Sequence, residues 1–263
     1  MLPREHGAWG MLLQPFVAAA ILCRTWNTEL TVSLVALLLA FIIREPLVVL
    51  ARQRWVWRDT RPETAVAKRV LAWEIPLLVV CGGFLWTSLP KVPLAALAAM
   101  GLMMTGAAVW MTLKNRQRST ALQIVSAFGL SSGALLAALA GVHELPPWAW
   151  ALWLVLSLHS FVGVLVVHAR LELRIRPSKE MHPSTALRVA YVAVGFLVVP
   201  AIWAGRTWSY ALAGAIAFSI MVHLTELYQL QRDEAMRERL QRVGLRMLGA
   251  SILHSALTVA ALW

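Results

Sequence analysis

Apolar residues occur in nine long runs, and these runs alternate with short polar or charged segments along the whole chain. A membrane-spanning helix needs about 20 mainly apolar residues, and most of the runs approach that length. The pattern predicts an all-α, polytopic membrane helical bundle of about nine transmembrane helices, forming a single integral membrane domain of residues 1–263. The predicted spans are 7–23, 30–50, 70–88, 93–113, 120–140, 148–168, 186–204, 209–227 and 244–262.

Basic residues indicate how the predicted spans are oriented. When the runs are threaded alternately through a bilayer, 20 of the 24 Lys and Arg residues fall on one side. Because short cytoplasmic loops carry an excess of Lys and Arg, we expect a cytoplasmic N-terminus and an outside C-terminus. The basic loops also account for the formal net charge of +11, so no nucleic-acid partner is expected.

Composition agrees with a membrane protein, because 59% of the residues are hydrophobic and only 14% are charged. Soluble domains contain about 25% charged residues. Small residues also bear on helix packing: Gly129 and Gly133 lie four positions apart in the fifth predicted span. This spacing permits two helices to approach closely, and we expect it to pack an internal helix pair rather than a dimer face.

The second predicted span is interrupted by Arg44, Glu45 and Pro46. A charge inside a span is costly and commonly marks a functional site with a specific partner. Glu45 follows Arg44 directly, but on a helix it points about 100° away, so its role as that partner stays open. Arg44 is therefore the first candidate for a ligand-binding residue.

Other ionisable and polar residues gather near the predicted cytoplasmic ends of several spans. They are Glu74, Lys114, Asn115, Arg116, Arg118, His168, Arg170, Glu172, His223 and Glu226. Their similar depth predicts a shared cavity that opens toward the cytoplasm, with the cations binding a ligand. In this interpretation the candidate catalytic residues Glu45, Glu74, His168 and Glu226 orient the cations or move protons. A structural alternative is that the charges neutralise one another while their stems reach toward water.

Histidines offer a further possibility. His159 and His254 lie midway along their predicted spans, and with His6 and His223 they are candidates for binding haem iron or another transition metal. No pair of histidines has a tight ligand spacing such as H-x-x-x-H. The sequence therefore predicts no metal ligands and leaves the cofactor unknown.

The N-terminal segment Pro3-Arg4-Glu5-His6-Gly7-Ala8-Trp9-Gly10 resembles the signature of the YwiC-like family of bacterial integral membrane proteins. The break at Arg44 and the basic run that starts at Lys114 fit this resemblance. It makes the N-terminal motif of Arg4, Glu5 and His6 a further candidate site. The resemblance implies a protein of the bacterial inner membrane and adds no particular reaction.

A weaker resemblance is to the UbiA superfamily of membrane prenyltransferases. It rests on nine spans, polar clusters after spans two and six, and the segment Arg58-Asp59-Thr60-Arg61-Pro62. The resemblance implies a UbiA-like bundle with a tunnel for an isoprenoid and Mg²⁺ bound to its diphosphate. This chain lacks the Asp-rich motifs that bind Mg²⁺, and its polar groups are mainly cationic, so a transferase activity is left open.

A cationic site can still hold an anion directly, because guanidinium groups pair bidentately with phosphate or carboxylate. The leading hypothesis is an amphiphilic isoprenoid, quinone or lipid-type ligand whose anionic or polar head binds the cations. The expected partner is thus a membrane lipid or an isoprenoid-type small molecule. Two alternatives remain: a small-anion transporter with Arg44 at mid-depth, and a haem- or metal-binding membrane protein.

Overall fold

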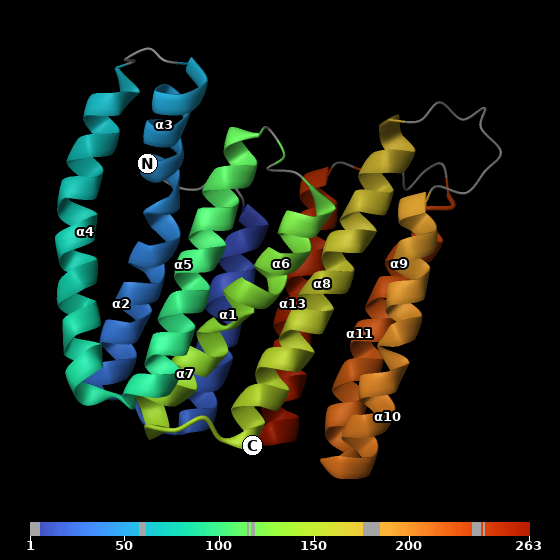
Figure 1. The fold of residues 1–263 in the computed structure, drawn as a ribbon. Coiled ribbons are helices and arrows are strands. Elements are labelled where there is room, and N and C mark those ends of the chain that lie inside the picture. The colour runs from blue at the N-terminus through green and yellow to red at the C-terminus, as the bar shows by residue number, and fades with distance from the viewer. Residues whose placement is uncertain are drawn as a thin grey trace. The chain divides into compact units, whose positions relative to one another are not determined.

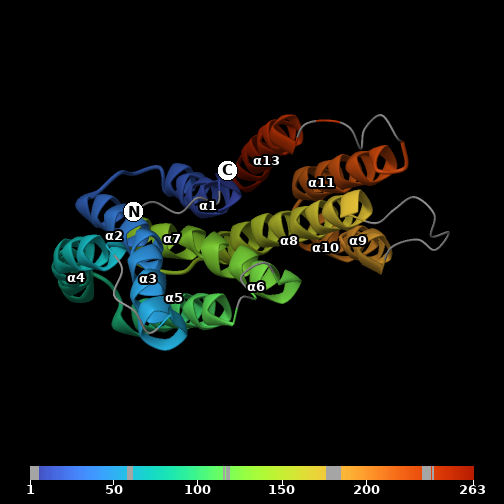
Figure 2. The same cartoon turned by 90° about the horizontal axis from the view of Figure 1, so that it is seen from above.

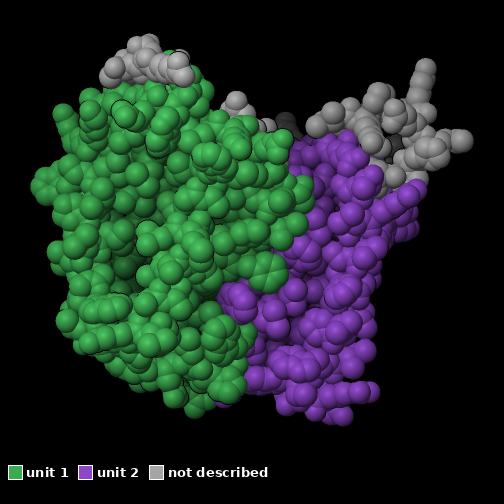
Figure 3. Space-filling model, viewed as in Figure 1, with its two compact units in different colours: residues 1–150 green, residues 151–263 purple. Residues whose placement is uncertain are grey.

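The computed structural model describes residues 6–57, 62–114, 116, 119–175, 185–232, 238 and 240–263. Every regular element in these ranges is a helix, which confirms the predicted all-α fold. The chain divides into two compact units, Met1–Trp150 and Ala151–Trp263, which Figure 3 colours separately. We call them unit 1 and unit 2 and describe each by itself.

Unit 1 is built from short and long helices in sequence. These are α1 (His6–Cys23), α2 (Thr28–Ile42), α3 (Arg44–Arg52), the π-helix η1 (Gln53–Trp57), α4 (Glu63–Ser88), α5 (Lys91–Leu113), α6 (Thr120–Ser131) and α7 (Gly133–Val142). Unit 2 contains most of the long helix α8 and the helices that follow it. These are α8 (Pro147–Ile175), α9 (Thr185–Phe196), α10 (Val198–Thr207), α11 (Tyr210–Gln229) and α13 (Leu240–Leu262).

The described helices confirm an integral, multi-pass membrane protein. Eight passes are long and apolar enough to cross a bilayer, and α1 is a further, shorter apolar helix. Some passes consist of consecutive helices: α2, α3 and η1 together form the pass Thr28–Trp57, and α9 with α10 forms Thr185–Thr207. The number of predicted apolar runs therefore agrees with the helices, although the first run is shorter than the rest.

Two passes extend further at their basic ends than the sequence suggested. The second pass continues through η1, so Arg52 and Arg54, which lie beyond the predicted span, are helical. Helix α8 likewise continues to Ile175 and includes Arg170 and Arg174. Arg is a good helix former and its long stem lets the charge reach water, so a helix can continue past the end of its apolar run.

The interruption in the second pass is a true helix break. Helix α2 ends at Ile42, and α3 begins at Arg44 with Pro46 as its third residue. Proline is tolerated in the first turn of a helix because the backbone N–H that it lacks would have no partner there. Both α2 and α3 pack against α4, and α3 also packs against α5. Figure 1 shows α2 and α3 following one another beside α4.

Small residues allow α7 to pack closely against α1. A Cβ atom added at Gly133 would lie 3.2 Å from the carbonyl oxygen of Leu12 and 3.1 Å from Cδ2 of Leu37. At Gly141 an added Cβ would lie only 2.4 Å from Sγ of Cys23. The predicted role of Gly133 in an internal helix pair is therefore confirmed.

Helix α11 is central to unit 2, where it packs against α9, α10 and α13. Figure 2 shows these helices grouped with α8. The buried face of α11 follows a helical spacing of three or four residues, which is typical of a core-facing stripe. Its buried residues are Leu212, Ala215, Ile216, Ser219, His223, Glu226 and Leu227. Polar residues thus share the face on which α11 is buried.

Candidate functional site

Unit 1 carries cations and indole rings together where α3, η1 and α5 end. We call Arg52, Trp57, Trp110 and Lys114 the basic aromatic surface. The Arg52 guanidinium lies 5.9 Å from the ring centroid of Trp57, and the Lys114 ammonium lies 4.6 Å from that of Trp110. Both distances fall within the range of cation–π attraction.

Arg52 also joins two helices of this surface. Its Nη2 donates a hydrogen bond to the carbonyl oxygen of Thr112, at 3.4 Å, and so links the end of α3 to the end of α5. The next residue, Gln53, is buried, and its amide oxygen accepts a hydrogen bond from the hydroxyl of Thr64 on α4. Gln53 begins the π-helix turn, a feature that occurs frequently at functional sites.

Trp57, Trp110 and Lys114 of the basic aromatic surface are exposed, and Arg52 is half-buried. The exposed fraction of Trp110 is 58%. Exposed Arg54, Trp55 and Arg116 follow in the same two segments. Indole rings favour the headgroup zone of a bilayer, and Lys and Arg there attract anionic lipids. The surface therefore has the chemistry to hold an anionic head beside an apolar chain.

Arg44 lies elsewhere in unit 1, at the start of α3. Its Nη2 contacts Oε1 of Glu45 at 2.9 Å, and both side chains are partly exposed, at 21% and 31%. The guanidinium also lies 6.0 Å from the ring of Phe41, against which Trp9 of α1 packs edge-on. The partner that the sequence left open is thus the adjacent Glu45, and the pair sits beside an aromatic contact.

Glu74 is half-buried on α4. Within the described chain its Oε2 is buried and makes no hydrogen bond. None of the hydrogen bonds or ion pairs that the structure describes joins Glu74 to a cation of the basic aromatic surface. Its predicted catalytic role stays a prediction.

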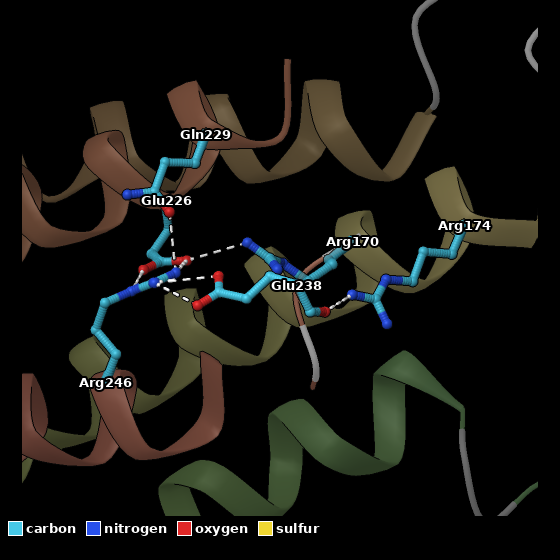
Figure 4. Close-up of polar contacts among 6 residues, drawn as sticks. All are labelled: Arg170, Arg174, Glu226, Gln229, Glu238 and Arg246. Atoms are coloured by element: carbon cyan, nitrogen blue, oxygen red, sulfur yellow. Dashed lines mark hydrogen bonds and ion pairs between the residues drawn. The ribbon is translucent and has the colours of Figure 1, made fainter. Parts of the chain in front are cut away.

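Unit 2 contains a network of buried charges, shown in Figure 4. Arg170 on α8 is only 2% exposed, and its Nη2 lies 3.4 Å from Oε2 of Glu226 on α11. Arg246 on α13 clamps the same carboxylate with two hydrogen bonds, Nε to Oε1 at 2.6 Å and Nη2 to Oε2 at 3.0 Å. One carboxylate therefore joins three helices of this unit.

Further polar groups extend this network toward its exposed end. Nη1 of Arg246 donates to both carboxylate oxygens of Glu238, each at 3.1 Å, and its Nη2 donates to Oε1 of Gln229 at 2.9 Å. Arg174 donates to the backbone carbonyl oxygen of Glu238. We call Arg170, Glu226, Glu238 and Arg246 the ionic network. Its two arginines and two glutamates balance in charge, so Arg170 is committed to an internal carboxylate.

Two other predicted residues lie on α8. His168 is half-buried. Glu172 accepts a hydrogen bond from the backbone N–H of Ala186, at 3.2 Å, in the first turn of α9. A carboxylate near a helix N-terminus satisfies free N–H groups and complements the helix dipole. The structure thus gives Glu172 a stabilising contact, and its predicted part in ligand binding stays untested.

Three histidines from three helices of unit 2 meet in the membrane-spanning region. The His159 ring lies 4.8 Å from that of His223 and 4.5 Å from that of His254, measured between centroids. We call these residues the histidine cluster. The rings of His159 and His254 are stacked, an arrangement that does not aim their nitrogens at one point. In the described parts of the chain, no group of three or more His, Cys, Asp or Glu residues is arranged to hold a metal ion.

Several predicted residues lie outside the part of the chain that the structure describes. They are Arg4, Glu5, the side chain of His6, Asn115 and Arg118. Of the others, Arg44, Glu45, Glu74, Lys114 and Arg116 belong to unit 1, and His168, Arg170, Glu172, His223 and Glu226 belong to unit 2. The structure brings together Arg44 with Glu45 and Arg170 with Glu226. A single shared cavity stays a prediction.

The site residues predicted from the sequence did not include Arg52, Trp57, Trp110 or Arg246. The first three could have been noticed from the aromatic residues that accompany basic residues near the ends of spans two and four. Arg246 offers no such signal, because it lies 20 positions from Glu226 and pairs with it only through the packing of α11 against α13. The convergence of the histidines likewise depends on tertiary packing.

Comparisons with known proteins identify one family. The model of the family described as YwiC-like protein matches residues 2–138. This range lies within unit 1 and ends in α7. No curated protein and no solved structure matches the chain.

Proposed function

The chain belongs to the YwiC-like family, and we propose that its basic aromatic surface binds the anionic head of a membrane amphiphile. The protein is an integral, multi-pass membrane protein. The proposal places it in a bacterial inner membrane with its N-terminus and the basic aromatic surface on the cytoplasmic side, as the distribution of Lys and Arg favours.

The observation that carries this proposal is that Arg52 and Lys114 each lie over an indole ring, at the ends of helices that can cross a membrane. A cation held over a ring keeps its position while its N–H groups remain able to donate to an anion. Guanidinium and phosphate groups form short, charge-assisted hydrogen bonds, which makes a phosphate-type head the best fit.

The apolar part of such a ligand would lie along the outside of α5. Exposed side chains on this helix include Leu102 at 75% and Met103 at 66%. In water such exposure of apolar side chains would be unfavourable. In a bilayer the same side chains contact apolar lipid chains, and the exposure carries no such cost. A charged head at Lys114 and an acyl or isoprenyl chain along α5 would therefore match the polarity of the helix.

The cationic character of the surface favours an anionic head over a neutral quinone ring. It does not specify a reaction, so the proposal is for binding, and a UbiA-like transferase activity remains a separate hypothesis. The transporter alternative depended on Arg44, and the contact of Arg44 with Glu45 gives that alternative less support.

Lipid binding to purified protein tests this proposal. We would measure the affinity for phosphatidylglycerol and for phosphatidylcholine by native mass spectrometry, with a polyprenyl phosphate as a second anionic probe. Each basic residue at a membrane surface contributes about 1 kcal/mol to binding of anionic lipid. The double variant Arg52→Ala/Lys114→Ala should therefore weaken phosphatidylglycerol binding by roughly 30-fold and leave phosphatidylcholine unaffected.

A charge-matched control separates a site from a general electrostatic effect. Lys68 and Arg69 are exposed residues of α4, near the same end of unit 1. Lys68→Ala/Arg69→Ala removes the same charge without touching the basic aromatic surface. If this control loses as much affinity as Arg52→Ala/Lys114→Ala, the proposed site does not exist. A preference between the two anionic probes would distinguish a phospholipid from an isoprenyl phosphate.

A further inference from the structure

We propose that unit 2 contains a proton-binding centre formed by the histidine cluster, which takes up one proton inside the membrane-spanning region. The proposal concerns unit 2 alone and does not depend on lipid binding to the basic aromatic surface. It follows from the burial of the three imidazoles, from their hydrogen bonds and from the polar residues that connect them to the ionic network.

The cluster lies deep within its helices. His159, His223 and His254 are 5%, 0% and 0% exposed, and they come from α8, α11 and α13. Each of these helices is long and apolar enough to cross a membrane. Ionisable residues at such positions are costly, and in membrane proteins they mark ion pathways and proton relays.

The hydrogen bonds of His254 leave a basic nitrogen available. Its Nδ1 lies 3.1 Å from the carbonyl oxygen of Ala215. A carbonyl oxygen can only accept, so Nδ1 must carry the hydrogen, and in the neutral ring Nε2 is then an unprotonated acceptor. Among the described residues this Nε2 is buried and has no hydrogen-bond partner.

His223 adds a second imidazole of the same kind. Neither of its ring nitrogens completes a hydrogen bond with any residue that the structure describes, although the ring is fully buried. Buried polar atoms are nearly always paired, so two unpaired acceptors in one cluster call for an explanation. A proton that binds to Nε2 of His254 or to a nitrogen of His223 would convert an unpaired lone pair into an N–H donor.

The position of His159 between the other two rings opposes the uptake of a second proton. Its ring centroid lies 4.5 Å from that of His254 and 4.8 Å from that of His223, so an imidazolium at His159 would be in contact with a charge on either neighbour. Like charges at such a separation repel strongly where water cannot screen them. His159 is further held by a hydrogen bond of 2.8 Å between its Nδ1 and the hydroxyl of Ser219. The first proton taken up therefore opposes the second.

A line of polar residues on α11 connects the cluster with the exposed end of the ionic network. Ser219, His223 and Glu226 are spaced four and three residues apart, so they lie on one helical face. His223 and Glu226 are about 4.5 Å apart along the helix axis. Beyond the buried Glu226, the side chain of Arg246 is 39% exposed. The proposal places the entry of the proton along this face.

The other charged groups near α11 do not compete for this role. Arg170 from α8 and Arg246 from α13 both contact Glu226. On the helices that pack against α11 from the other side, Arg188 of α9 and Arg206 of α10 are exposed. Tyr191 of α9 accepts a hydrogen bond from Gln231 at 2.9 Å. The histidines are thus the titratable groups that face one another in this region.

Nitrogen NMR of histidine in lipid bilayers tests the proposal. The sequence has seven histidines, and replacing His6, His143, His168 and His182 by Gln leaves only the cluster. With ¹⁵N-labelled histidine, we expect one imidazolium per protein to appear reversibly on acidification from about pH 8 to about pH 4. Three rings that stay neutral in folded protein, or three that titrate independently, would overturn the proposal.

A substitution identifies the contribution of His254. Asn in place of His254 retains a side-chain N–H that can donate to Ala215 but lacks the basic Nε2. The His254→Asn protein should form the imidazolium at a lower pH or not at all, because one of the two unpaired acceptors is gone. An unchanged titration would contradict the cluster as a unit. If the four-Gln protein does not fold, the count is made on the wild-type chain, in which buried imidazolium N–H groups exchange slowly with deuterium.

Discussion

Units 1 and 2 use the same types of charged residue in opposite ways. In unit 1 the Arg44–Glu45 pair is partly exposed, and the cations of the basic aromatic surface lie at an open end of the helices. In unit 2 Arg170 and Glu226 are almost fully buried, and one carboxylate holds two guanidinium groups. A charge near water is weakly coupled to its neighbours, whereas a buried charge depends on its partner. The comparison teaches that burial decides whether the charge of an Arg is neutralised inside the fold or stays accessible at its surface.

The family relationship follows the same division. The YwiC-like match covers residues 2–138, which include the basic aromatic surface and the break at Arg44. The ionic network and the histidine cluster lie beyond residue 138. The family assignment therefore rests on residues of unit 1 alone. The inference about the histidine cluster rests on the geometry of unit 2.

The largest effect is expected at Glu226. Glu226→Ala leaves Arg170 buried without its carboxylate, and breaking a buried ion pair in this way costs about 3–5 kcal/mol of unfolding free energy. Unfolding by sodium dodecyl sulfate in mixed micelles, followed by Trp fluorescence, measures the change.

A second variant shows whether the cost comes from the stranded charge. In Arg170→Met/Glu226→Met both members of the pair are replaced by apolar side chains, and most of the stability should return. Equal destabilisation of the single and double variants would mean that Arg170 is not the residue that depends on Glu226.

In unit 1 the largest effect should come from apolar packing rather than from charge. Gly141→Ala would place a Cβ 2.4 Å from Sγ of Cys23, so the helices must move apart. Overpacking of this kind costs about 1–3 kcal/mol. Gly82→Ala is the matched control, because no atom lies within 4 Å of an added Cβ there. Ala is a better helix former than Gly, so this control should gain about 0.5–1 kcal/mol. The same loss at both glycines would contradict the close contact of α7 with α1.

Removing Arg246 should have a smaller effect than removing Glu226. Its own side chain is 39% exposed, and without it the buried Glu226 still pairs with Arg170. Hydrogen bonds to charged groups contribute about 1.5–3 kcal/mol when buried, and partial exposure reduces this to about 1–2 kcal/mol for Arg246→Ala. A double-mutant cycle with Glu226→Ala measures the coupling, and a coupling near zero would contradict the network in unit 2.

The smallest effect is expected at Glu45. Its pair with Arg44 is partly exposed on both sides, and exposed pairs contribute about 0–1 kcal/mol. Glu45→Gln should therefore change the unfolding free energy by less than about 1 kcal/mol. A loss as large as that of Glu226→Ala would remove the contrast between the two units.

Much of the helical architecture follows from the pattern of apolar runs. The break at Arg44–Pro46 and the close packing at Gly133 were predicted from single residues, because Pro and Gly constrain the backbone wherever they occur. Helix ends were less well predicted. The end of an apolar run indicates where the contact of a helix with lipid chains ends, and the helix itself can be longer. Helix α8 and the second pass continue through Arg residues, which are good helix formers.

The candidate site was predicted only in part. Arg170 and Glu226 were both selected as ionisable residues near a span end, but their ion pair joins positions 56 residues apart. Periodicity reports which face of one helix is polar and carries no information about which face of another helix it meets. Lys114 was selected for its charge, and only the structure shows its ammonium over Trp110.

The amino-acid sequence by itself determined that this chain forms apolar helices that suit a membrane and where the second of them breaks. These are properties of local composition, and they follow from the cost of placing polar groups in lipid. Which side of the bilayer its basic residues face stays a prediction. Tertiary structure decided which charges neutralise one another and which remain exposed. It also brought His159, His223 and His254 together from three helices. Contacts of this kind depend on how the helices rotate and pack against one another, which no single run of residues encodes.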